Sequence, residues 1–399
     1  MITTTYSKGK LAAKTGNEAM AEAMRQISPD VVAAYPITPA TEIVQIFSQF
    51  VADGIVPTEY VAVESEHSAM SACIGASAAG ARVMTGTSSQ GLALMWEMLY
   101  IAAGLRLPII LSDVNRALSA PINIHGDQSD TMGARDSGWI QIYSENSQEA
   151  YDNLIQAVRI AEKAKLPVMV TTDGFIISHC MEVVELLPDE DVKKFVGEYK
   201  PERYLLDIKK PFTLGAIDLQ DYYFEHRVQL AEAMTSSKQI ILDVAKDFSE
   251  NFNREYSFYE KYRMEDAETA IIIIGSAAGT AKVVVDELRK KGVKAGLIKI
   301  RVFRPFPHKE LAQDLAKVKA LAIMDRADSC SAAFAPLYTD VTSALFTHLG
   351  ANSPKTINCV YGLGGRDIIL DHFREVFSKL EKIKSGEKFN KEIEYINLR

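Results

Sequence analysis

The chain has 399 residues, of which 47% are hydrophobic and 24% are charged, so it can bury large cores in two or three domains. Its net charge of −8 is modest, and the absence of a Lys/Arg-rich run argues against a nucleic-acid partner. No apolar run approaches the length of a membrane span and the N-terminal stretch lacks the apolar core of a secretory signal, so we expect a cytoplasmic protein without a membrane partner.

The first half of the chain alternates between strand-like and helix-like segments. Short runs rich in Val and Ile predict strands at 31–35, 60–64, 82–87, 107–113 and 166–174. Helical patterns lie between them, at 16–27, 40–50, 66–80, 90–104 and 147–165. This alternation is typical of βαβ units around a parallel sheet. The polar stretch 115–137 has no clear period, and a loop of this length inside a domain is usually functional.

The second half changes character and then resumes the alternation. A charged stretch with prolines is followed by a long polar helical pattern at 220–258, and strands are predicted at 269–275, 294–303, 320–325 and 356–362. We therefore expect an α/β fold with a first domain at 1–183, a helical connector at 184–260 and a smaller α/β domain at 261–399.

A glycine-containing stretch, GSAAGT at 275–280, follows a predicted strand and opens a helix, as dinucleotide-binding loops do. It lacks the full G-x-G-x-x-G, and no acidic residue follows the next strand to bind a ribose. The pattern therefore favours a glycine turn with close helix packing.

A stiff turn follows the first strand of the alternating region. In AAYPITPATEI, Pro36 and Pro39 each fix φ and remove a backbone donor, and Thr38 lies between them. Rigid turns at the carboxyl ends of strands are where α/β proteins hold ligands. We expect this turn to form part of a binding site.

An acidic residue, Glu66, lies in ESEHSAMSACIGASAAGA, where we expect a helix to begin at about Glu66 and to continue with many small residues. Small residues let a flat ligand or a backbone approach closely. A carboxylate in the first turn of a helix is also stabilised by the helix dipole, so a purely structural role is the alternative. Glu64 and His67 compete with Glu66 for any catalytic role.

Two further polar groups follow strands. Arg116 begins the long loop, where a guanidinium can bind a carboxylate in a bidentate manner; a salt bridge to Asp113 or Asp127 is the alternative. In TGTSSQG at 85–91, short polar side chains precede a helix and could line a polar cradle, although helix capping by serine explains them equally well.

The four cysteines, at positions 73, 180, 330 and 359, form no C-x-x-C pair. This spacing favours buried small hydrophobes over a disulfide framework, and argues against an iron–sulfur or zinc site built by this chain alone. We predict no metal site in this chain.

Five ordered motifs, YPITPATEI, ESEHSAMSACIGASAAGAR, TSSQGLALMWEM, DVNRALSAPINIHGDQSD and RDSGWIQIYSENSQEAYD, closely resemble the α subunits of the 2-oxoacid:ferredoxin oxidoreductase family, and the pyruvate:ferredoxin type in particular. The resemblance extends through GSAAGTAKVVVDELRKKGVKAGLIKIRVFRPFP to VYGLGGRD, nearly the whole chain. It implies a parallel-sheet domain of the kind that binds the pyrimidine half of thiamine diphosphate, followed by a domain like the transketolase C-terminal one.

The resemblance also implies a function. Enzymes of this family decarboxylate a 2-oxoacid on thiamine diphosphate, pass electrons through iron–sulfur clusters to ferredoxin and release an acyl-CoA from coenzyme A. Pyruvate oxidation to acetyl-CoA and CO₂ is the expected reaction, with its reversal as a second direction. The alternatives are a subunit acting on 2-oxoisovalerate or 2-oxoglutarate, a noncatalytic scaffold subunit and, outside the family, a nucleotide-dependent dehydrogenase.

The motif match assigns expected roles to individual residues. Glu66 matches the glutamate that hydrogen-bonds the aminopyrimidine ring, and is the expected catalytic residue. Thr38 and Arg116 match the residues that contact the substrate. The other expected cofactor contacts are Pro36, Ile37, Ser88 and Gln90.

The chain also lacks parts of the expected machinery. In HGDQSD, Gln128 stands where the second glycine of the diphosphate-binding G-D-G motif should be, and no suitable asparagine follows TTDGF. We therefore expect a β subunit to supply the diphosphate half of the site and Mg²⁺, with 4Fe–4S clusters on partner subunits, and γ and ferredoxin-like δ subunits to complete a heteromeric complex.

Overall fold

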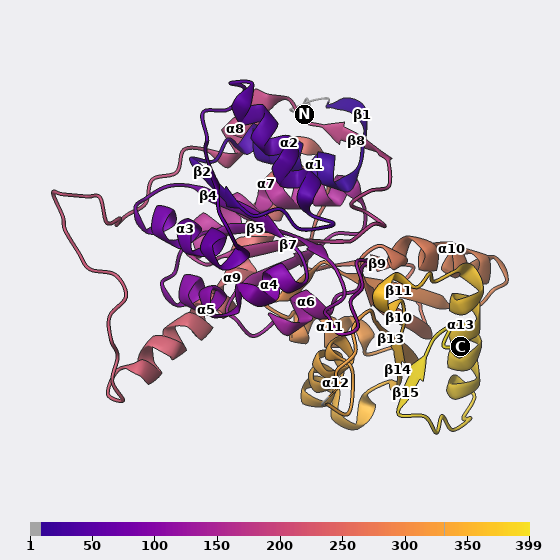
Figure 1. The fold of residues 1–399 in the computed structure, drawn as a ribbon. Coiled ribbons are helices and arrows are strands. Elements are labelled where there is room, and N and C mark those ends of the chain that lie inside the picture. Colours follow the sequence, from indigo (N-terminus) through magenta and orange to yellow (C-terminus); the bar gives the residue numbers. More distant parts are fainter. Residues whose placement is uncertain (1–8, 331) are drawn as a thin grey trace, which may run out of the picture.

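Two sheets, each built mainly from parallel strands, organise the computed structural model, which describes residues 9–330 and 332–399. Figure 1 shows them as two neighbouring lobes, the first in indigo to magenta and the second in orange to yellow. The predicted α/β class is confirmed. The boundaries expected at residues 183 and 260 stay a prediction, and we use the terms first and second domain for the two lobes.

The first domain is built around a seven-stranded sheet. Its strands, in spatial order, are β12 (Val302–Arg304), β6 (Ile140–Tyr143), β7 (Val168–Asp173), β5 (Ile110–Asn115), β4 (Val83–Thr87), β2 (Val31–Ala34) and β3 (Glu59–Ala62). All neighbours pair in parallel except β12, which runs antiparallel to β6. A separate two-stranded antiparallel sheet joins β1 (Lys10–Lys14) and β8 (Glu182–Leu186).

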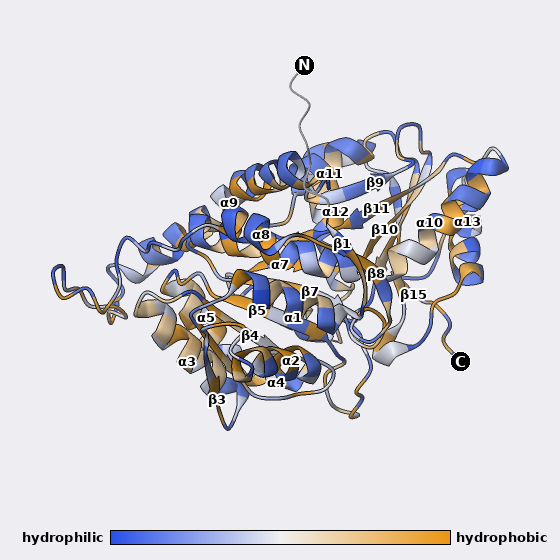
Figure 2. Ribbon diagram, turned by 90° about the horizontal axis from the view of Figure 1, so that it is seen from above, coloured by the Kyte–Doolittle hydropathy of each residue, from blue (hydrophilic) through white to orange (hydrophobic). Residues whose placement is uncertain are grey.

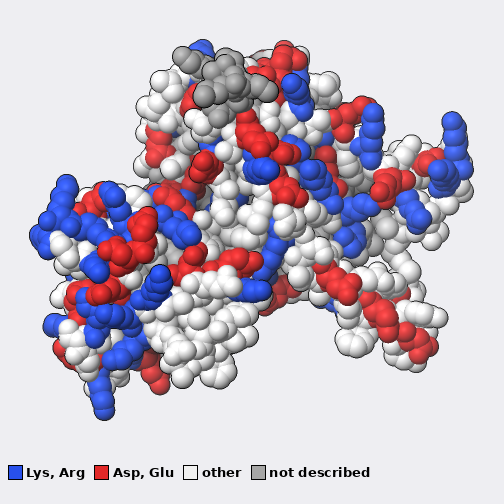
Figure 3. Space-filling view, turned by 180° about the vertical axis from the view of Figure 1, so that it is seen from behind, with Lys and Arg blue, Asp and Glu red and all other residues white. Residues whose placement is uncertain are grey.

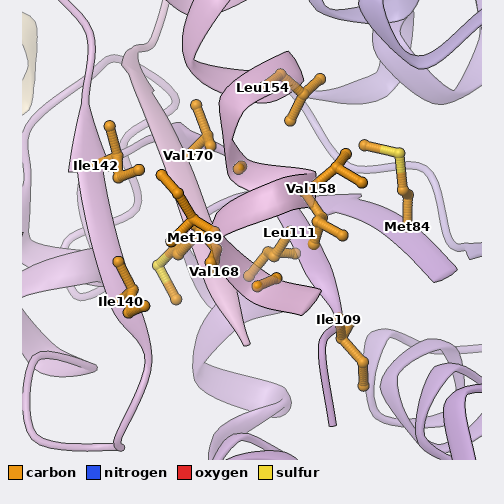
Figure 4. Close-up of a cluster of buried hydrophobic side chains, with 14 of the residues drawn as sticks. Met84, Ile109, Leu111, Ile140, Ile142, Leu154, Val158, Val168, Met169 and Val170 are labelled. Atoms are coloured by element: carbon orange, nitrogen blue, oxygen red, sulfur yellow. The ribbon is translucent and has the colours of Figure 1, made fainter. Parts of the chain in front are cut away.

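Helices flank the first sheet. They are α1 (Gly16–Ile27), α2 (Thr41–Ala52), α3 (Glu66–Ala78), α4 (Gln90–Leu94), α5 (Trp96–Gly104), α6 (Ser129–Gly133), α7 (Ser147–Ala164) and α8 (Asp189–Val196). The central strands β5 and β7 are buried along their whole length, as expected of a parallel sheet covered on both faces. Figure 4 shows Leu111 of β5 close to Val158 of α7, in the buried cluster that also contains Val168 and Leu154. This core fixes the strand ends that carry the candidate site.

The second domain repeats the pattern with a six-stranded sheet. Its strands, in order, are β15 (Ile393–Tyr395), β14 (Lys355–Val360), β13 (Ala320–Asp325), β10 (Thr269–Ile274), β11 (Ala295–Ile300) and β9 (Tyr259–Tyr262). Only β9 pairs antiparallel. The accompanying helices are α10 (Ala277–Lys290), α11 (His308–Leu315), α12 (Pro336–Leu349), α13 (Leu370–Lys384) and the short η1 (Gly350–Asn352) and η2 (Leu363–Gly365).

A 30-residue helix, α9 (Tyr223–Phe252), lies in the second half of the predicted connector. Its second half is not purely polar, because Ile241, Val244 and Phe248 are buried in the core of the first domain. Its first two turns are exposed as far as Leu230, and together with the preceding loop they extend from the body in Figures 1 and 2. Among the described residues, no helix is both long and apolar enough to cross a membrane.

Several predicted elements differ from the structure. The strand expected at 294–303 breaks at Arg301, whose buried guanidinium donates to Asn153 Oδ1 at 2.7 Å and Gln156 Oε1 at 3.2 Å on α7. The chain then leaves the second sheet and adds β12 to the first. The helix expected at 90–104 divides at Met95 into α4 and α5, and the loop expected at 115–137 contains α6.

The carboxyl ends of the two sheets meet in a buried polar interface. Asp173, at the end of β7, pairs with Arg326, which follows β13, at 3.0 Å, and the two side chains are only 1% and 2% exposed. Asp173 also accepts hydrogen bonds from Ser276 N at 2.8 Å and from Ser276 Oγ at 2.5 Å. A Cβ on Gly275, where φ is +79°, would lie 2.6 Å from the Asp173 carboxylate. The glycine-turn prediction for GSAAGT is confirmed, and the turn binds the other domain.

Candidate active site

The residues predicted for the site come from four adjacent strands. Arg116 follows β5, residues 88–90 follow β4, Thr38 follows β2, and Glu66 begins α3 after β3. These strands lie in the order β5-β4-β2-β3 and pair in parallel, so their carboxyl ends share one edge of the sheet. That edge is where open α/β sheets bind ligands.

Glu66 is the buried acid of this edge. It lies at the first position of α3, whose N-cap Ser65 accepts a hydrogen bond from Ser68 N, and it is 6% exposed. Its carboxyl group has no hydrogen-bond partner within the described part of the chain. A Cβ on Gly91 would lie 2.8 Å from Glu66 Oε1 and 2.3 Å from Thr87 Oγ1, so only glycine leaves room there. A buried carboxyl without a protein partner is costly unless something else binds it.

The two competitors of Glu66 are engaged elsewhere. Glu64 is exposed and accepts a hydrogen bond from Ser68, which lowers the pKa of Glu64. His67 pairs with Glu97 at 3.2 Å, and both side chains are largely open to solvent. Glu66 is therefore the residue of this stretch that is placed to meet a ligand in a buried environment.

Arg116 and Thr38 are brought together. The Arg116 guanidinium donates from Nη1 to Thr38 O at 3.0 Å and from Nε to Asn123 O at 2.9 Å, and the residue is 8% exposed. Both partners are neutral carbonyl groups, and among the described residues no carboxylate pairs with Arg116. The alternative of a salt bridge to Asp113 or Asp127 is therefore wrong. A nearly buried cation without an anion attracts one.

The proline turn is anchored around Thr38. Asn17 Nδ2 donates to Pro39 O at 2.8 Å, and Ile37 packs against the core of the first domain. Pro36 and Thr38 are exposed, and the Thr38 hydroxyl has no partner among the residues described. The turn therefore leaves the Thr38 side chain exposed while its main-chain carbonyl binds the Arg116 guanidinium.

The serines after β4 do not cap a helix, so that alternative is wrong. Ser89 is the N-cap residue of α4, but its hydroxyl donates to Ala117 O and to Gln90 Oε1, both at 2.7 Å. The Ser88 and Thr87 hydroxyls are buried, and neither has a hydrogen-bond partner. The Thr87 hydroxyl lies with Glu66 beside Gly91, which fits a polar cradle.

A buried acidic pair behind this edge was not predicted from the sequence. Asp130 in α6 accepts hydrogen bonds from the backbone N–H groups of Ser89 and Arg116, and Asn115 Nδ2 donates to both Asp130 and Asp113. Burial raises the pKa of Asp130 to about 7, and burial together with the Asp130 charge raises the pKa of Asp113 well above its ordinary value. Burial therefore opposes the charged form of both carboxyl groups, and the hydrogen bonds that Asp130 accepts favour its charged form.

The second domain reaches the loop that carries Arg116. Asn123 Nδ2 donates to Gly364 O at 3.0 Å, and Gly364 N donates to Asp127 Oδ2 at 2.9 Å. Gly364 has φ +60°, and a Cβ there would lie 2.3 Å from Asn123 Nδ2. The glycine turn in η2 thus clamps the loop whose Asn123 carbonyl binds Arg116.

Two other features do not enlarge the site. Glu145, Glu149 and Glu260 lie close enough to hold an ion, but Lys299 and Lys282 bridge them, so we interpret the cluster as an ion-pair network. Cavities of about 500 and 320 Å³ lie between α7, α8 and α9 and beside the start of the connector. Neither is lined by Glu66, Thr38 or Arg116.

Two family models match the chain. Residues 22–246 match the thiamine diphosphate-binding domain of pyruvate flavodoxin/ferredoxin oxidoreductase, and residues 267–373 match core domain II of pyruvate:ferredoxin oxidoreductase. Pyruvate synthase subunit PorA of Thermotoga maritima is 57% identical over 97% of this chain and 98% of its own length. The corresponding subunit of Methanocaldococcus jannaschii is 47% identical over 92% and 94%. Ketoisovalerate oxidoreductase subunit VorA of Pyrococcus abyssi is 44% identical over 96% and 97%.

Solved structures share the fold. A 2-oxoglutarate:ferredoxin oxidoreductase from Magnetococcus marinus superposes with a TM-score of 0.69 at 20% identity, over 93% of this chain and 66% of that one. A split-gene transketolase superposes with a TM-score of 0.56 at 11% identity, over 94% and 100%. At these identities the likeness shows the fold alone, and it confirms the expected transketolase-like architecture. On the match of its sequence to the family models and to relatives over nearly its whole length, the chain belongs to the pyruvate:ferredoxin oxidoreductase family.

Proposed function

We propose that this chain is the α subunit of an enzyme that oxidatively decarboxylates pyruvate to acetyl-CoA and CO₂, with ferredoxin as electron acceptor. The observation that carries the proposal is one sheet edge that presents a buried, unpartnered carboxyl group at Glu66 and a nearly buried, unpaired guanidinium at Arg116. The naming of the Thermotoga and Methanocaldococcus relatives as pyruvate synthase subunits supports it.

The residues at this edge fit the aminopyrimidine half of thiamine diphosphate. Glu66 offers a carboxyl group without a protein partner, Gly91 leaves space beside it, and the buried hydroxyls of Thr87 and Ser88 lack partners. When bound, thiamine diphosphate supplies a nucleophilic carbon and an electron sink for decarboxylation. Glu66, which is only 6% exposed, would hydrogen-bond a nitrogen of the ring. Pro36, Ile37 and Gln90 would complete the cofactor contacts.

Substrate binding falls to Arg116 and Thr38. Arg116 would neutralise the carboxylate of the 2-oxoacid, and the two carbonyl groups that hold its guanidinium orient it without cancelling its charge. The Thr38 hydroxyl would meet the substrate from a turn that is already fixed, so little ordering accompanies binding.

The remaining parts would come from other chains. Of the four cysteines, Cys73 and Cys359 are buried in separate cores and Cys180 and Cys330 are exposed. We therefore assign the 4Fe–4S clusters, Mg²⁺ and the diphosphate half of the cofactor site to partner subunits of the β, γ and ferredoxin-like δ kinds. Coenzyme A is the expected co-substrate. On the face drawn in Figure 3, basic and acidic side chains both occur, and the absence of a nucleic-acid partner stays a prediction. A cytoplasmic location stays a prediction.

A branched 2-oxoacid is the second candidate substrate. The Pyrococcus abyssi subunit named for ketoisovalerate is 44% identical to this chain, as is the pyruvate synthase subunit of the same organism. Sequence identity to these two relatives therefore does not decide between pyruvate and 2-oxoisovalerate as the substrate. The test below includes both acids.

Arg116→Gln in the assembled complex tests the proposal. Loss of a shielded charge-assisted contact removes roughly 2–5 kcal/mol of binding free energy. Because about 1.4 kcal/mol is a factor of ten, the apparent KM for pyruvate should rise at least tenfold. Arg116→Lys should recover only part of this, because an ammonium lacks the planar fork. The apparent thiamine diphosphate constant should barely change.

The assay is a steady-state titration with pyruvate, 2-oxobutyrate, 2-oxoisovalerate and 2-oxoglutarate, with a viologen dye as acceptor. Arg82→Gln is the matched control, because Arg82 is also nearly buried but pairs with Glu162, and it lies at the amino end of β4. Equal pyruvate constants in wild type and Arg116→Gln would refute the substrate role. A wild-type preference for 2-oxoisovalerate would select the second candidate.

A further inference from the structure

We infer that Asp130 is a positioning residue for this site: its one carboxylate fixes the two turns that carry Arg116 and residues 88–90. The inference rests on the proposed function, and it adds a residue that contacts neither the substrate nor the cofactor.

The contacts of Asp130 connect three segments. Its Oδ2 accepts from Ser89 N at 3.0 Å and from Arg116 N at 2.9 Å, so a single oxygen joins the turns after β4 and β5. Its Oδ1 accepts from Thr131 N at 2.8 Å and from Asn115 Nδ2 at 2.9 Å. All four donors point at a side chain that is only 4% exposed. Shifting Asp130 would therefore shift both turns.

A role limited to α6 does not account for these contacts. At the start of this short helix Asp130 binds only Thr131 N, and Asp127 binds Ser129 N, whereas Ser89 lies 41 residues away from Asp130 along the chain. Ser89 is also held at φ +49° and ψ −118°, a conformation rare for a residue with a side chain. Such backbone persists only where its surroundings impose it, and here the bonds to Asp130 and to Ala117 O do so.

The charge of Asp130 strengthens this arrangement. Asp113 lies beside it, is completely buried, and shares the Asn115 amide group. Asp130 accepts four hydrogen bonds and Asp113 accepts one, so the surroundings favour the charged form at Asp130 over the charged form at Asp113. A charged acceptor binds backbone N–H groups more strongly than a neutral one.

Asp130→Asn in the assembled complex tests the inference. The amide NH₂ would face two N–H donors in either orientation, so the turns must move. A displacement on the order of 1 Å can cost up to a hundredfold, and we expect kcat/KM for pyruvate to fall at least roughly tenfold. The apparent thiamine diphosphate constant should also rise, unlike in Arg116→Gln, because residues 88–90 move as well. In an Arg116→Gln background, the additional loss in kcat/KM should be much smaller, because the guanidinium being positioned is gone.

Asp325→Asn is the matched control. Asp325 is also a buried carboxyl that accepts two backbone N–H groups, from Leu337 and Tyr338, and an Asn side chain, but at the start of α12. The Asp325→Asn variant should differ from wild type in thermal stability, but its apparent constants for pyruvate and for thiamine diphosphate should be unchanged. An unchanged pyruvate constant in Asp130→Asn, or an equal rise in Asp325→Asn, would overturn the inference.

Two outcomes keep the test decisive. If Asp130→Asn does not assemble, Asn115→Ala is used instead, because it removes only one of the donors to Asp130. A severalfold rise in the apparent KM for pyruvate then supports the inference. An unchanged KM refutes it. If the wild-type complex shows no pyruvate-dependent dye reduction, the proposed function is refuted. If the wild-type complex is active and Asp130→Asn has the same constants as wild type, only the inference about Asp130 is refuted.

Discussion

Arg326→Gln should loosen the contact between the two domains. The substitution leaves Asp173 with the hydrogen bonds from Ser276 and Gln128 but without a cation, in a place where its side chain is 1% exposed. Removing one partner of a buried pair typically costs about 3–5 kcal/mol, because the remaining charge is uncompensated. For a domain of 150–250 residues, each kcal/mol lowers the melting temperature by about 2–4 °C, so we expect a drop of roughly 6–20 °C.

Calorimetry of the assembled complex measures this effect. The double variant Asp173→Asn/Arg326→Gln should be destabilised by less than the sum of the two single variants, because no unpaired charge remains. Arg374→Gln is the surface control: its pair with Glu287 has side chains 42% and 35% exposed, and exposed pairs contribute little. If Arg326→Gln melts at the same temperature as Arg374→Gln, the buried pair does not hold the domains together.

Three further predictions concern the site. Glu66→Ala should leave the complex assembled but stop turnover with saturating thiamine diphosphate, since it removes the buried carboxyl group that lies beside Gly91; near-normal turnover would transfer the role to Glu64. Gly364→Ala should raise the pyruvate constant severalfold by pushing Asn123, whereas Gly54→Ala, at a similar φ of +69° with nothing within 4 Å, should not; equal effects would contradict the clamp. The isolated chain should bind thiamine diphosphate and Mg²⁺ only weakly, and tight binding measured by isothermal titration calorimetry would contradict the divided site.

The parts of the fold that local patterns determine were predicted well. Helix α1 has the predicted bounds, because Thr15 and Glu18 form a capping box and a regular apolar face follows. Glu66 was found because a carboxylate at the start of a small-residue helix is visible in the sequence, and the family resemblance gave it a role. The Glu66, Thr38 and Arg116 roles themselves stay predictions.

What the sequence did not reveal depends on contacts between distant residues. Asp130 binds Ser89 across 41 positions, and nothing in the pattern HGDQSD distinguishes its second aspartate from an ordinary loop residue. The break at Arg301 was missed for the same reason, because the hydrogen bonds that turn the chain there come from α7, about 150 positions earlier (148 for Asn153 and 145 for Gln156). In both cases a buried polar side chain forms its hydrogen bonds with a distant segment, and these bonds determine the local structure more strongly than the nearby sequence pattern does.

The glycine turn at Gly364 has a consequence for changing the substrate of such an enzyme. The loop that presents Arg116 is bound on one side by Thr38 of its own domain and on the other by a turn more than 200 residues later in the chain. Grafting the Arg116 loop from a relative with a different oxoacid would therefore separate it from the turn to which it is fitted. The loop and the turn should therefore be transferred together. Designs that transfer both should retain affinity for the oxoacid better than designs that transfer the loop alone.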